Sequence, residues 1–279
     1  MPASLAVLCP EPGYPLTWKP AFESIRASLH RVGVRAIAVP WSDEIDSIHT
    51  AVCPLLAWGY HRDVPKWHGV LRKLANNFLT INSIRLLHWN TSKSYLLQLA
   101  RCGLPIVPTV HLASATREDL RAIFREFNVD VLIIKPLVGA SSDGIVKLGD
   151  PHDAPSRMED ILIQPFMPSI CKEGEFSLVY FAGRFSHAVC KKPSQGDFRV
   201  QVQFGARTVA IDPSHDMIRL GSDALNLCPE RPAYARVDMV RSGSVTHVME
   251  IELIEPDLFL LNDSRSMQNF SQAITDAMQ

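Results

Sequence analysis

Residues 235–256 read ARVDMVRSGSVTHVMEIELIEP, two apolar runs separated by a short polar turn. The pattern predicts two antiparallel β-strands. Asp238 interrupts the first run, and Glu250 and Glu252 interrupt the second. Because side chains two residues apart on a strand share a face, Glu250 and Glu252 point the same way, and so do Arg236 and Asp238. Carboxylates inside such apolar strands need partners, since burial of an unpaired charge is strongly unfavourable.

This acidic cluster predicts a cation site. Carboxylate oxygens are ligands that Mg²⁺ prefers, and the phosphates of a nucleotide would complete the coordination begun by Asp238, Glu250 and Glu252. Arg236 could then meet charge that develops on a transferred phosphate. The alternative is an exposed strand face with ordinary salt bridges, which the dense apolar flanks disfavour.

Upstream of this pair of strands, residues 190–206 read CKKPSQGDFRVQVQFGA. Lys191, Lys192 and Arg199 surround a Gly-Asp turn, where they could bind a γ-phosphate or a substrate carboxylate. Arg199 suits bidentate capture of a carboxylate. A solvated basic hairpin explains this segment equally well.

Residues 161–181, ILIQPFMPSICKEGEFSLVYF, predict a nucleotide-binding hinge. Gln164, Phe166 and Met167 end one strand, and Glu175 begins the next. Such a hinge can offer backbone hydrogen bonds and apolar side chains to adenine and a carboxylate to ribose hydroxyls.

Residues 135–148, KPLVGASSDGIVKL, place Lys135 at the end of an apolar strand, before a loop of small residues that includes Ser141 and Ser142. Small residues let backbone N–H groups approach a polyphosphate, and the lysine supplies positive charge. No Gly-Lys-Ser/Thr opens a helix, so this is not a P-loop. The alternative is a β-hairpin turn with a surface lysine.

The first part of the chain predicts a small parallel α/β lobe. Apolar runs at 4–9, 34–40 and 51–57 favour strands, and residues 20–32 carry apolar side chains at helical spacing. A second helix is expected at 64–77.

The remainder predicts a mixed region that ends in a mostly antiparallel sheet, so the fold class is α/β (α+β). Helices are expected at 92–102, 117–127 and 264–278. Strands are expected at 107–111, 131–134, 161–164, 176–181, 185–191, 198–203, 235–240 and 245–253.

Composition excludes several classes of protein. Of 279 residues, 47% are hydrophobic and 20% charged, with a net charge of −1, which excludes a disordered chain and gives no electrostatic footprint for nucleic acid or an acidic membrane. No apolar run reaches the roughly 18 residues needed to span a bilayer. The start lacks the basic region of a signal peptide, and six cysteines without a C-x-x-C pair are typical of reduced, mostly buried cytoplasmic thiols.

Segments along nearly the whole chain resemble the ATP-grasp superfamily, and within it the O-ureido-serine cyclo-ligase group of D-cycloserine biosynthesis. These segments are residues 41–43, 57–60, 87–96, 103–109, 174–179, 186–189, 196–201 and 249–256. The resemblance implies an ATP-grasp fold with a pre-ATP-grasp lobe at 1–83, a central subdomain at 84–163 and a C-terminal subdomain at 164–279.

The resemblance also implies roles for individual residues. The nucleotide-binding residues are Lys93, Lys135, Ser141, Ser142, Gln164, Phe166, Met167, Glu175 and Lys191. The metal-binding residues are Asp238, Glu250 and Glu252, and the candidate catalytic residues are Arg236, Arg199 and Lys192. Either Lys191 or Lys192 matches the lysine that binds the γ-phosphate.

Three positions depart from the pattern. Glu252 stands where many ATP-grasp enzymes have Asn, which makes the metal site more acidic, and Gln164 stands where Glu is common. Gly59 replaces the aspartate of a Trp-Asp-Tyr sequence, which predicts a different substrate if that aspartate contacts it.

The implied activity is that of an ATP- and Mg²⁺-dependent ligase. A substrate carboxylate attacks the γ-phosphate, giving an acylphosphate and ADP, and a nitrogen then displaces phosphate. Two Mg²⁺ ions are expected, with Mn²⁺ as a substitute. The expected partner is a small amino-acid-like molecule in the cytoplasm, not nucleic acid or membrane, and a homo-oligomer is left open. The alternatives are an intermolecular ligase that forms an amide or dipeptide, a kinase-like activity, and a nucleotide-binding protein without chemistry.

Overall fold

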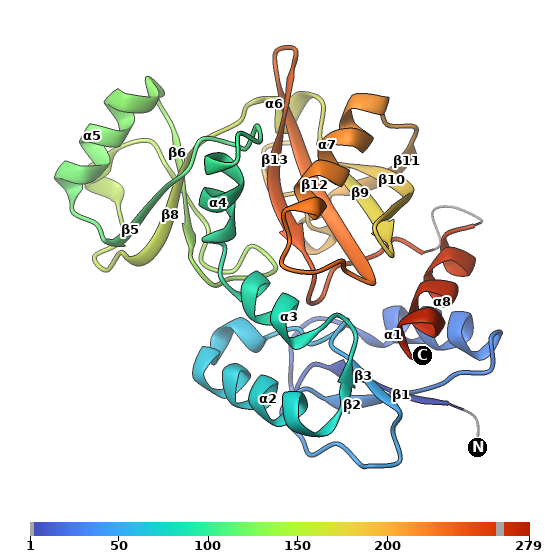
Figure 1. Cartoon of the computed structure of the whole chain (residues 1–279). Coiled ribbons are helices and arrows are strands. Elements are labelled where there is room, and N and C mark those ends of the chain that lie inside the picture. Colours follow the sequence, from blue (N-terminus) through green and yellow to red (C-terminus); the bar gives the residue numbers. More distant parts are fainter. Residues whose placement is uncertain (1–2, 261–264) are drawn as a thin grey trace.

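The computed structural model describes residues 3–260 and 265–279, arranged around three sheets (Figure 1). The strands are β1 Ser4–Cys9, β2 Arg35–Pro40, β3 Ala51–Cys53, β4 Leu79–Thr80, β5 Val110–Ser114, β6 Leu132–Pro136, β7 Val146–Leu148, β8 Glu159–Pro165, β9 Glu175–Phe181, β10 Arg184–Lys192, β11 Arg207–Ile211, β12 Tyr234–Ser242 and β13 Val245–Glu252. The α-helices are α1 Lys19–His30, α2 Val64–Asn77, α3 Ile84–Thr91, α4 Tyr95–Arg101, α5 Arg117–Phe127, α6 Ser169–Lys172, α7 His215–Asn226 and α8 Ser266–Ala277. Short 3₁₀ turns cover Tyr60–Arg62, Pro151–Asp153 and Val202–Phe204.

The N-terminal lobe is a parallel sheet with the order β2-β1-β3-β4, as the sequence predicted. Every residue of β1 is buried, so its alternating side chains serve two cores. Leu5 and Val7 pack with α1, and Ala6 and Leu8 pack with α2. Helix α8 returns to this lobe, where Phe270 joins the same core as Leu5 and the helix lies beside α1 (Figure 1). Residue 264, the first of the predicted closing helix, lies outside the described residues.

The other two sheets are antiparallel. The central sheet has the order β5-β8-β6-β7, and α5 buries Leu120 and Ile123 against it. The large sheet has the order β11-β10-β9-β12-β13, and α7 packs on it through Met217 and Ala224. The division of the chain at residues 83 and 163 stays a prediction.

The outer edge of β13 forms one parallel bridge, between Val248 and Ile106, and near Ile251 and Leu253 it is covered by side chains instead of by another strand. The amide of Asn90 donates to the carbonyl of Ile251 (2.7 Å) and accepts from the N–H of Leu253 (2.8 Å). The hydroxyl of Tyr95 donates to the Ile251 carbonyl (2.9 Å) and accepts from its N–H (2.8 Å). Because buried backbone groups need partners, these contacts from α3 and α4 fix the position of the strand that carries Glu250 and Glu252.

Several predicted elements differ from the structure. The strand at 51–57 ends at Cys53, because Pro54 cannot donate to a neighbouring strand. The predicted helix 92–102 begins at Tyr95 with Ser94 as its N-cap, and α3 and α7 were not predicted.

The predicted strand 198–203 is wrong. The carboxylate of Asp197 accepts hydrogen bonds from the backbone N–H groups of Phe198 (2.7 Å) and Arg199 (2.9 Å). This side-chain turn competes with strand pairing, and the strand of this region is β11 instead.

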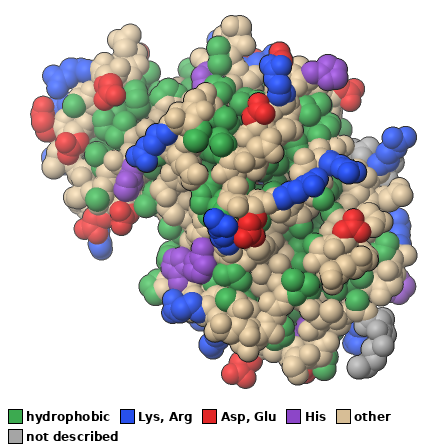
Figure 2. All heavy atoms as spheres, viewed as in Figure 1, with side chains coloured by type: hydrophobic (Ala, Val, Ile, Leu, Met, Phe, Trp, Pro, Cys, Tyr) green, Lys and Arg blue, Asp and Glu red, His purple; other side chains and the backbone are tan. Residues whose placement is uncertain are grey.

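The surface gives two further observations. Cys102 and Cys171 are exposed, so the prediction of mostly buried thiols is wrong for these two. Figure 2 shows basic and acidic side chains scattered over the viewed face without a continuous patch of one sign. No helix in the described part of the chain is both long and apolar enough to cross a membrane.

The Asn90 contacts predict a stability effect. In Asn90→Ala the Ile251 carbonyl loses one hydrogen bond and the Leu253 N–H loses its partner, at a cost of about 2–3 kcal/mol. Urea unfolding would measure this as a lower midpoint with an unchanged slope. Asn77→Ala is the matched control, because Asn77 is exposed and contacts only the Lys73 carbonyl of its own helix. Equal midpoints for the two variants would contradict the role given to Asn90.

Candidate active site

Two adjoining cavities lie between the central sheet and the large sheet. The first has a volume of about 480 Å³ and the second about 90 Å³. The residues that line both are Lys135, Ser142, Ile145, Val200, Gln201, Arg236, Glu250 and Glu252. The predicted residues of the hinge line only the second cavity, and residues of the N-terminal lobe line only the first. We call these shared residues the junction. It separates the smaller cavity, lined by the predicted hinge, from the part of the larger cavity that the N-terminal lobe lines.

The β12–β13 hairpin forms the floor of this junction. Its register places Arg236 opposite Glu252 and Asp238 opposite Glu250, so the four charged side chains meet on one face. The guanidinium of Arg236 donates to both oxygens of Asp238 (2.9 and 2.8 Å) and also contacts Glu252. Ser177 on β9 donates to Asp238 as well (2.5 Å). The sequence prediction that these residues converge is confirmed.

Lys191 and Lys192 lie on opposite faces of β10. The ammonium of Lys191 is buried and lies 2.5 Å from Glu175 and 3.3 Å from Asp238. Burial lowers the pKa of Lys191, but Asp238 and Glu175 outweigh burial and raise it overall. Lys192 is exposed and lines neither cavity, so the structure places Lys191, and not Lys192, in the site.

Two further lysines approach from the other side. The ammonium of Lys93, just before α4, donates to the Gly139 carbonyl (2.8 Å) and contacts Glu250. Lys135, at the end of β6, is only 7% exposed and has no ion pair with any described residue. Burial lowers its pKa. A buried, unpaired ammonium at the wall of a cavity is suited to bind an anion.

The loop after Lys135 closes over the junction. Ser141 and Ser142 adopt positive φ angles of 55° and 61°, and Gly144 follows at 75°. A Cβ atom at Gly144 would lie 2.8 Å from the ring of Pro136, so the turn requires glycine there. Asp143 anchors the loop to the N-terminal lobe, 3.1 Å from the guanidinium of Arg62.

The hinge is packed more closely than the sequence suggested. The amide of Gln164 donates to the hydroxyl of Thr109 (2.9 Å), and the ring of Phe166 lies 4.1 Å from the ammonium of Lys147. Met167 and Glu175 also line the smaller cavity. Burial raises the pKa of Glu175, although its ion pair with Lys191 opposes that rise.

Arg199 is held by its own segment. Its guanidinium lies 2.8 Å from Asp197 and 3.6 Å from the ring centre of Phe204. The hydrogen bonds from Arg199 lower the pKa of Asp197 well below its usual value. Arg199 lines the smaller cavity, yet capture of a substrate carboxylate would require it to exchange this partner.

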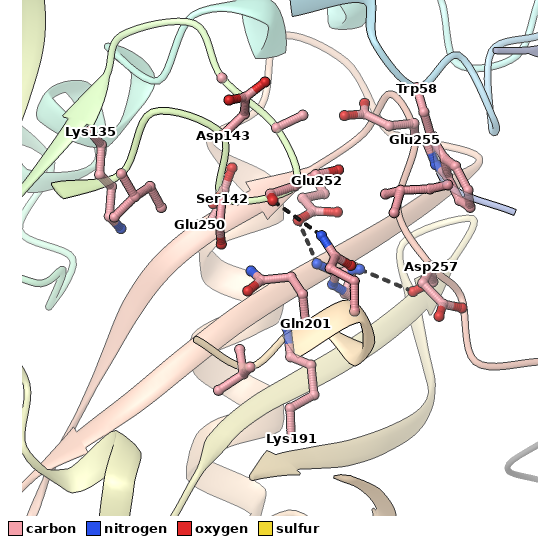
Figure 3. A pocket seen from close by; sticks show the side chains of 18 of the residues that line it. Trp58, Lys135, Ser142, Asp143, Lys191, Gln201, Glu250, Glu252, Glu255 and Asp257 are labelled. Carbon is pink, nitrogen blue, oxygen red and sulfur yellow. Dashed lines mark hydrogen bonds and ion pairs between the residues drawn. The ribbon is translucent and has the colours of Figure 1, made fainter. Parts of the chain in front are cut away.

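Sequence reasoning missed one end of the larger cavity. Trp58, Tyr60, Glu255, Asp257 and Gln201 line it, and Figure 3 shows Trp58 and Glu255 together on the opposite side from Lys135. Residues 57–60 and 249–256 belonged to the segments of resemblance, but nothing in their spacing shows that the fold brings them together.

Burial, with a smaller contribution from neighbouring carboxylates, raises the pKa values of two acids in the site. Burial is the main cause for Glu252, whose pKa rises to about 7 even though Arg236 opposes the shift. Burial and the charge of Glu252 raise the pKa of Glu255 to about 8. The site therefore carries more acidic groups than it can keep fully ionised at neutral pH.

The carboxylates of the site fit Mg²⁺ only if a bound ligand supplies further oxygen atoms. Within residues 3–260 and 265–279, no three acidic, histidine or cysteine side chains converge enough to enclose a metal ion alone. Asp238, Glu250 and Glu252 supply hard oxygens, but each is already paired with a cation. Phosphate oxygens would complete the coordination and attract those cations, which fits a metal that arrives with a nucleotide.

No family model matches this chain. It is 27% identical over 272 residues to the "Cycloserine biosynthesis protein DcsG" of Streptomyces lavendulae, a match that covers 89% of this chain and 90% of the relative.

Solved structures are similar over almost the whole chain. The crystal structure of the D-cycloserine synthetase DcsG has a TM-score of 0.86 at 23% identity, covering 99% of this chain and 100% of the other. The ATP-grasp ligase PsnB, solved with a phosphomimetic precursor variant, Mg and ADP, has a TM-score of 0.68 at 14% identity, covering 99% and 98%. The D-alanine–D-alanine ligase of Bacillus anthracis has a TM-score of 0.67 at 15% identity, covering 99% and 96%. The predicted ATP-grasp fold is confirmed.

The two neighbouring lysines of β10 form a matched pair for mutation. Lys191→Met leaves Glu175 without its cation, so we expect a loss of roughly 3 kcal/mol in stability, as for other broken buried ion pairs. Lys192→Met should change stability by less than about 0.5 kcal/mol, because the side chain is exposed. Urea unfolding of both variants measures the difference. A larger effect at position 192 would show that the orientation of β10 is wrong.

The raised pKa of Glu252 predicts a pH effect on stability. Between about pH 4.5 and pH 7 the folded protein holds a proton on Glu252 that the unfolded chain releases, so this group's contribution to stability falls as pH rises. Glu252→Gln removes the effect. The stability difference, variant minus wild type, should therefore increase with pH across this window in chelator-treated samples. Urea midpoints from pH 5 to pH 8 test the slope, and a flat or falling difference would contradict it.

Proposed function

We propose that this chain, which has the ATP-grasp fold and resembles the cycloserine biosynthesis protein DcsG over 89% of its length, is an ADP-forming ligase. It activates a small amino-acid-type carboxylate with ATP and Mg²⁺ for attack by a nitrogen nucleophile. The observation that carries the proposal is the junction itself. The unpaired ammonium of Lys135 lies there with Arg236 and Glu250, between a hinge cavity and a separate substrate-sized cavity.

The nucleotide would bind across the smaller cavity. Adenine would lie near Phe166 and Met167, and the phosphates would point towards Lys135 at the junction. The smaller cavity is about 90 Å³, so nucleotide entry requires the covering segment around Arg199 and Val200 to move.

The first chemical step is phosphoryl transfer. A carboxylate oxygen of the substrate attacks the γ-phosphorus, the bond to the β,γ-bridging oxygen breaks, and ADP leaves. Lys93, Lys135 and Arg236 hold and neutralise the transferred group, and Lys191 keeps Asp238 in place. Asp238, Glu250 and Glu252 would hold Mg²⁺, which would supply positive charge to neutralise the phosphates.

The second step forms the product bond. A nitrogen attacks the acyl carbon and loses a proton, and the C–O bond to phosphate breaks, so one oxygen of the original carboxylate leaves as phosphate. Arg236, which lies at the junction in contact with Glu252, would stabilise the tetrahedral oxyanion. In the DcsG-like case both reacting groups belong to one molecule of the O-ureido-serine type, so ring closure is intramolecular. Positioning, and not a protein nucleophile, supplies the rate.

Several finer features belong to the same proposal. We place the enzyme in the cytoplasm, where ATP is available and free cysteines such as Cys9 and Cys53 stay reduced. The segments 1–83, 84–163 and 164–279 would act as pre-ATP-grasp lobe, central subdomain and C-terminal subdomain. The oligomeric state is open to a homo-oligomer.

The test is ADP release from Mg²⁺-ATP with O-ureido-D-serine, its L form, and common D- and L-amino acids. With an ¹⁸O-labelled carboxylate, the ligase mechanism transfers one labelled oxygen to inorganic phosphate. Lys135→Ala should weaken nucleotide binding at least tenfold, and Glu250→Gln should lose Mg²⁺-dependent turnover while remaining folded.

Each outcome assigns the activity. Release with a single amino acid supports the cyclo-ligase form, and release that needs two substrates supports the intermolecular ligase. Unlabelled phosphate would exclude an acylphosphate. ATP binding without substrate-dependent ADP release would favour a nucleotide-binding protein without chemistry.

A further inference from the structure

The two ends of the larger cavity differ in charge. The junction end carries the ammonium of Lys135 and the guanidinium of Arg236. The far end, bounded by the N-terminal lobe, carries the carboxylate of Glu255 beside two aromatic rings. Figure 3 shows Glu255 next to the indole of Trp58, with Glu252 between them and the junction. A molecule that spans the cavity therefore meets cations at one end and the carboxyl group of Glu255, which has no ion pair with a described residue, at the other.

Glu255 differs from Asp238, Glu250 and Glu252 in having no ion pair with a described residue. Asp238, Glu250 and Glu252 each have a lysine or arginine within ion-pair distance, whereas no such contact to Glu255 occurs in the described ranges. Asp257 is also engaged, because its carboxylate accepts from the N–H of Phe259 (2.9 Å). Glu255 is thus a partly buried acid that no protein cation neutralises.

Tyr60 supplies a second, independent observation. Its side chain is only 4% exposed, yet it lines the cavity, and its hydroxyl has no hydrogen-bond partner among the residues that the structure describes. Gly59, at a φ of 93°, makes the tight turn that presents Trp58 and Tyr60 to the same cavity. Because the rest of the side chain is buried and the hydroxyl has no partner among the described residues, the hydroxyl oxygen is free to bond a group that a ligand brings into the cavity.

We propose that Glu255, Tyr60 and Trp58 form the subsite that binds the α-ammonium group of the substrate. The inference rests on the proposed function and adds to it which residues select an amino acid over a simple carboxylic acid. The ammonium donates to the carboxylate of Glu255 and to the hydroxyl oxygen of Tyr60, and the face of Trp58 adds a cation–π contact. The substrate carboxylate is attracted to Lys135 and Arg236 at the junction, so the ammonium group is directed to Glu255 at the far end.

The test separates recognition of the ammonium from nucleotide binding. Calorimetry measures the affinity of O-ureido-D-serine, of its des-amino analogue 3-(ureidooxy)propanoate and of a panel of D- and L-amino acids, with Mg²⁺ and a non-hydrolysable ATP analogue present. In the wild type the amino compound that binds should do so at least 30-fold tighter than its des-amino analogue. Glu255→Gln should weaken the amino compound 10- to 100-fold and leave the des-amino analogue and the nucleotide unchanged. Tyr60→Phe should weaken the amino compound about 5-fold.

A control variant and the turnover measurement separate a failure of the subsite from a failure of the ligase proposal. Glu126→Gln makes the same change on the exposed face of α5 and should have no effect. If Glu255→Gln weakens nucleotide or both carboxylates equally, Glu255 is a metal ligand or a structural residue and the inference is wrong. If no amino acid binds the wild type, it is also wrong. If Glu255→Gln no longer distinguishes the amino compound from its des-amino analogue, and the wild type shows no turnover, the subsite is supported and the ligase proposal is refuted. If the wild type turns over and Glu255→Gln distinguishes the two compounds as well as the wild type does, the ligase proposal is supported and the subsite is refuted.

Discussion

The need to pair buried charge is the constraint on which the rest of this structure depends. Asp238 lies in a strand whose other side chains form the core, so it must be neutralised by groups from elsewhere in the fold. Arg236 from its own strand and Lys191 from β10 do this, while Lys93 reaches Glu250 from the segment before α4. Three parts of the chain must therefore be in register before these charges are satisfied. The same requirement creates the site, because the paired groups are those that a nucleotide phosphate and a metal can recruit.

A short stretch before α4 serves both the scaffold and the chemistry. Asn90 and Tyr95 saturate the edge of β13, and Lys93, between them in the sequence, contacts Glu250 on that strand. A further strand at this edge would have satisfied the backbone equally well, but it would have extended the sheet across the place that Lys93 occupies. Covering the edge with side chains leaves that space for an ammonium. The position of the carboxylates and the position of the lysine are therefore set by one set of contacts.

Regular elements were predictable where a single signal dominated. The helix 117–127 was predicted with its observed bounds, and its Thr116–Asp119 capping box supplies the start. The segment after Gly196 was wrongly predicted as a strand, because the turn made by the Asp197 carboxylate overrides an alternating apolar pattern. The charged residues of the hairpin could be found because their apolar setting is visible in the sequence. Glu255 and Tyr60 could not be identified as site residues from the sequence. They are distant in the sequence, and only the packing of the N-terminal lobe onto the large sheet brings them into one cavity.

The charge balance of the site favours a nucleotide that arrives with its metal. Lys93, Lys135, Lys191 and Arg236 lie among the carboxyl groups of Glu175, Asp238, Glu250, Glu252 and Glu255. Burial, together with neighbouring carboxylates, raises the pKa values of Glu252 and Glu255. A bare polyphosphate would add further negative charge and would compete for the same lysines. In the proposed ligase, Mg²⁺ bound with the nucleotide would give the carboxylates a new counter-ion, and Lys93 and Arg236 would become available to the phosphates. Binding would then be an exchange of ion pairs in which no buried charge is left alone. The same need for a counter-ion applies at the far end of the cavity. Glu255 has no ion pair with a described residue there and burial raises its pKa, so a cationic group of the proposed substrate would favour its ionised form.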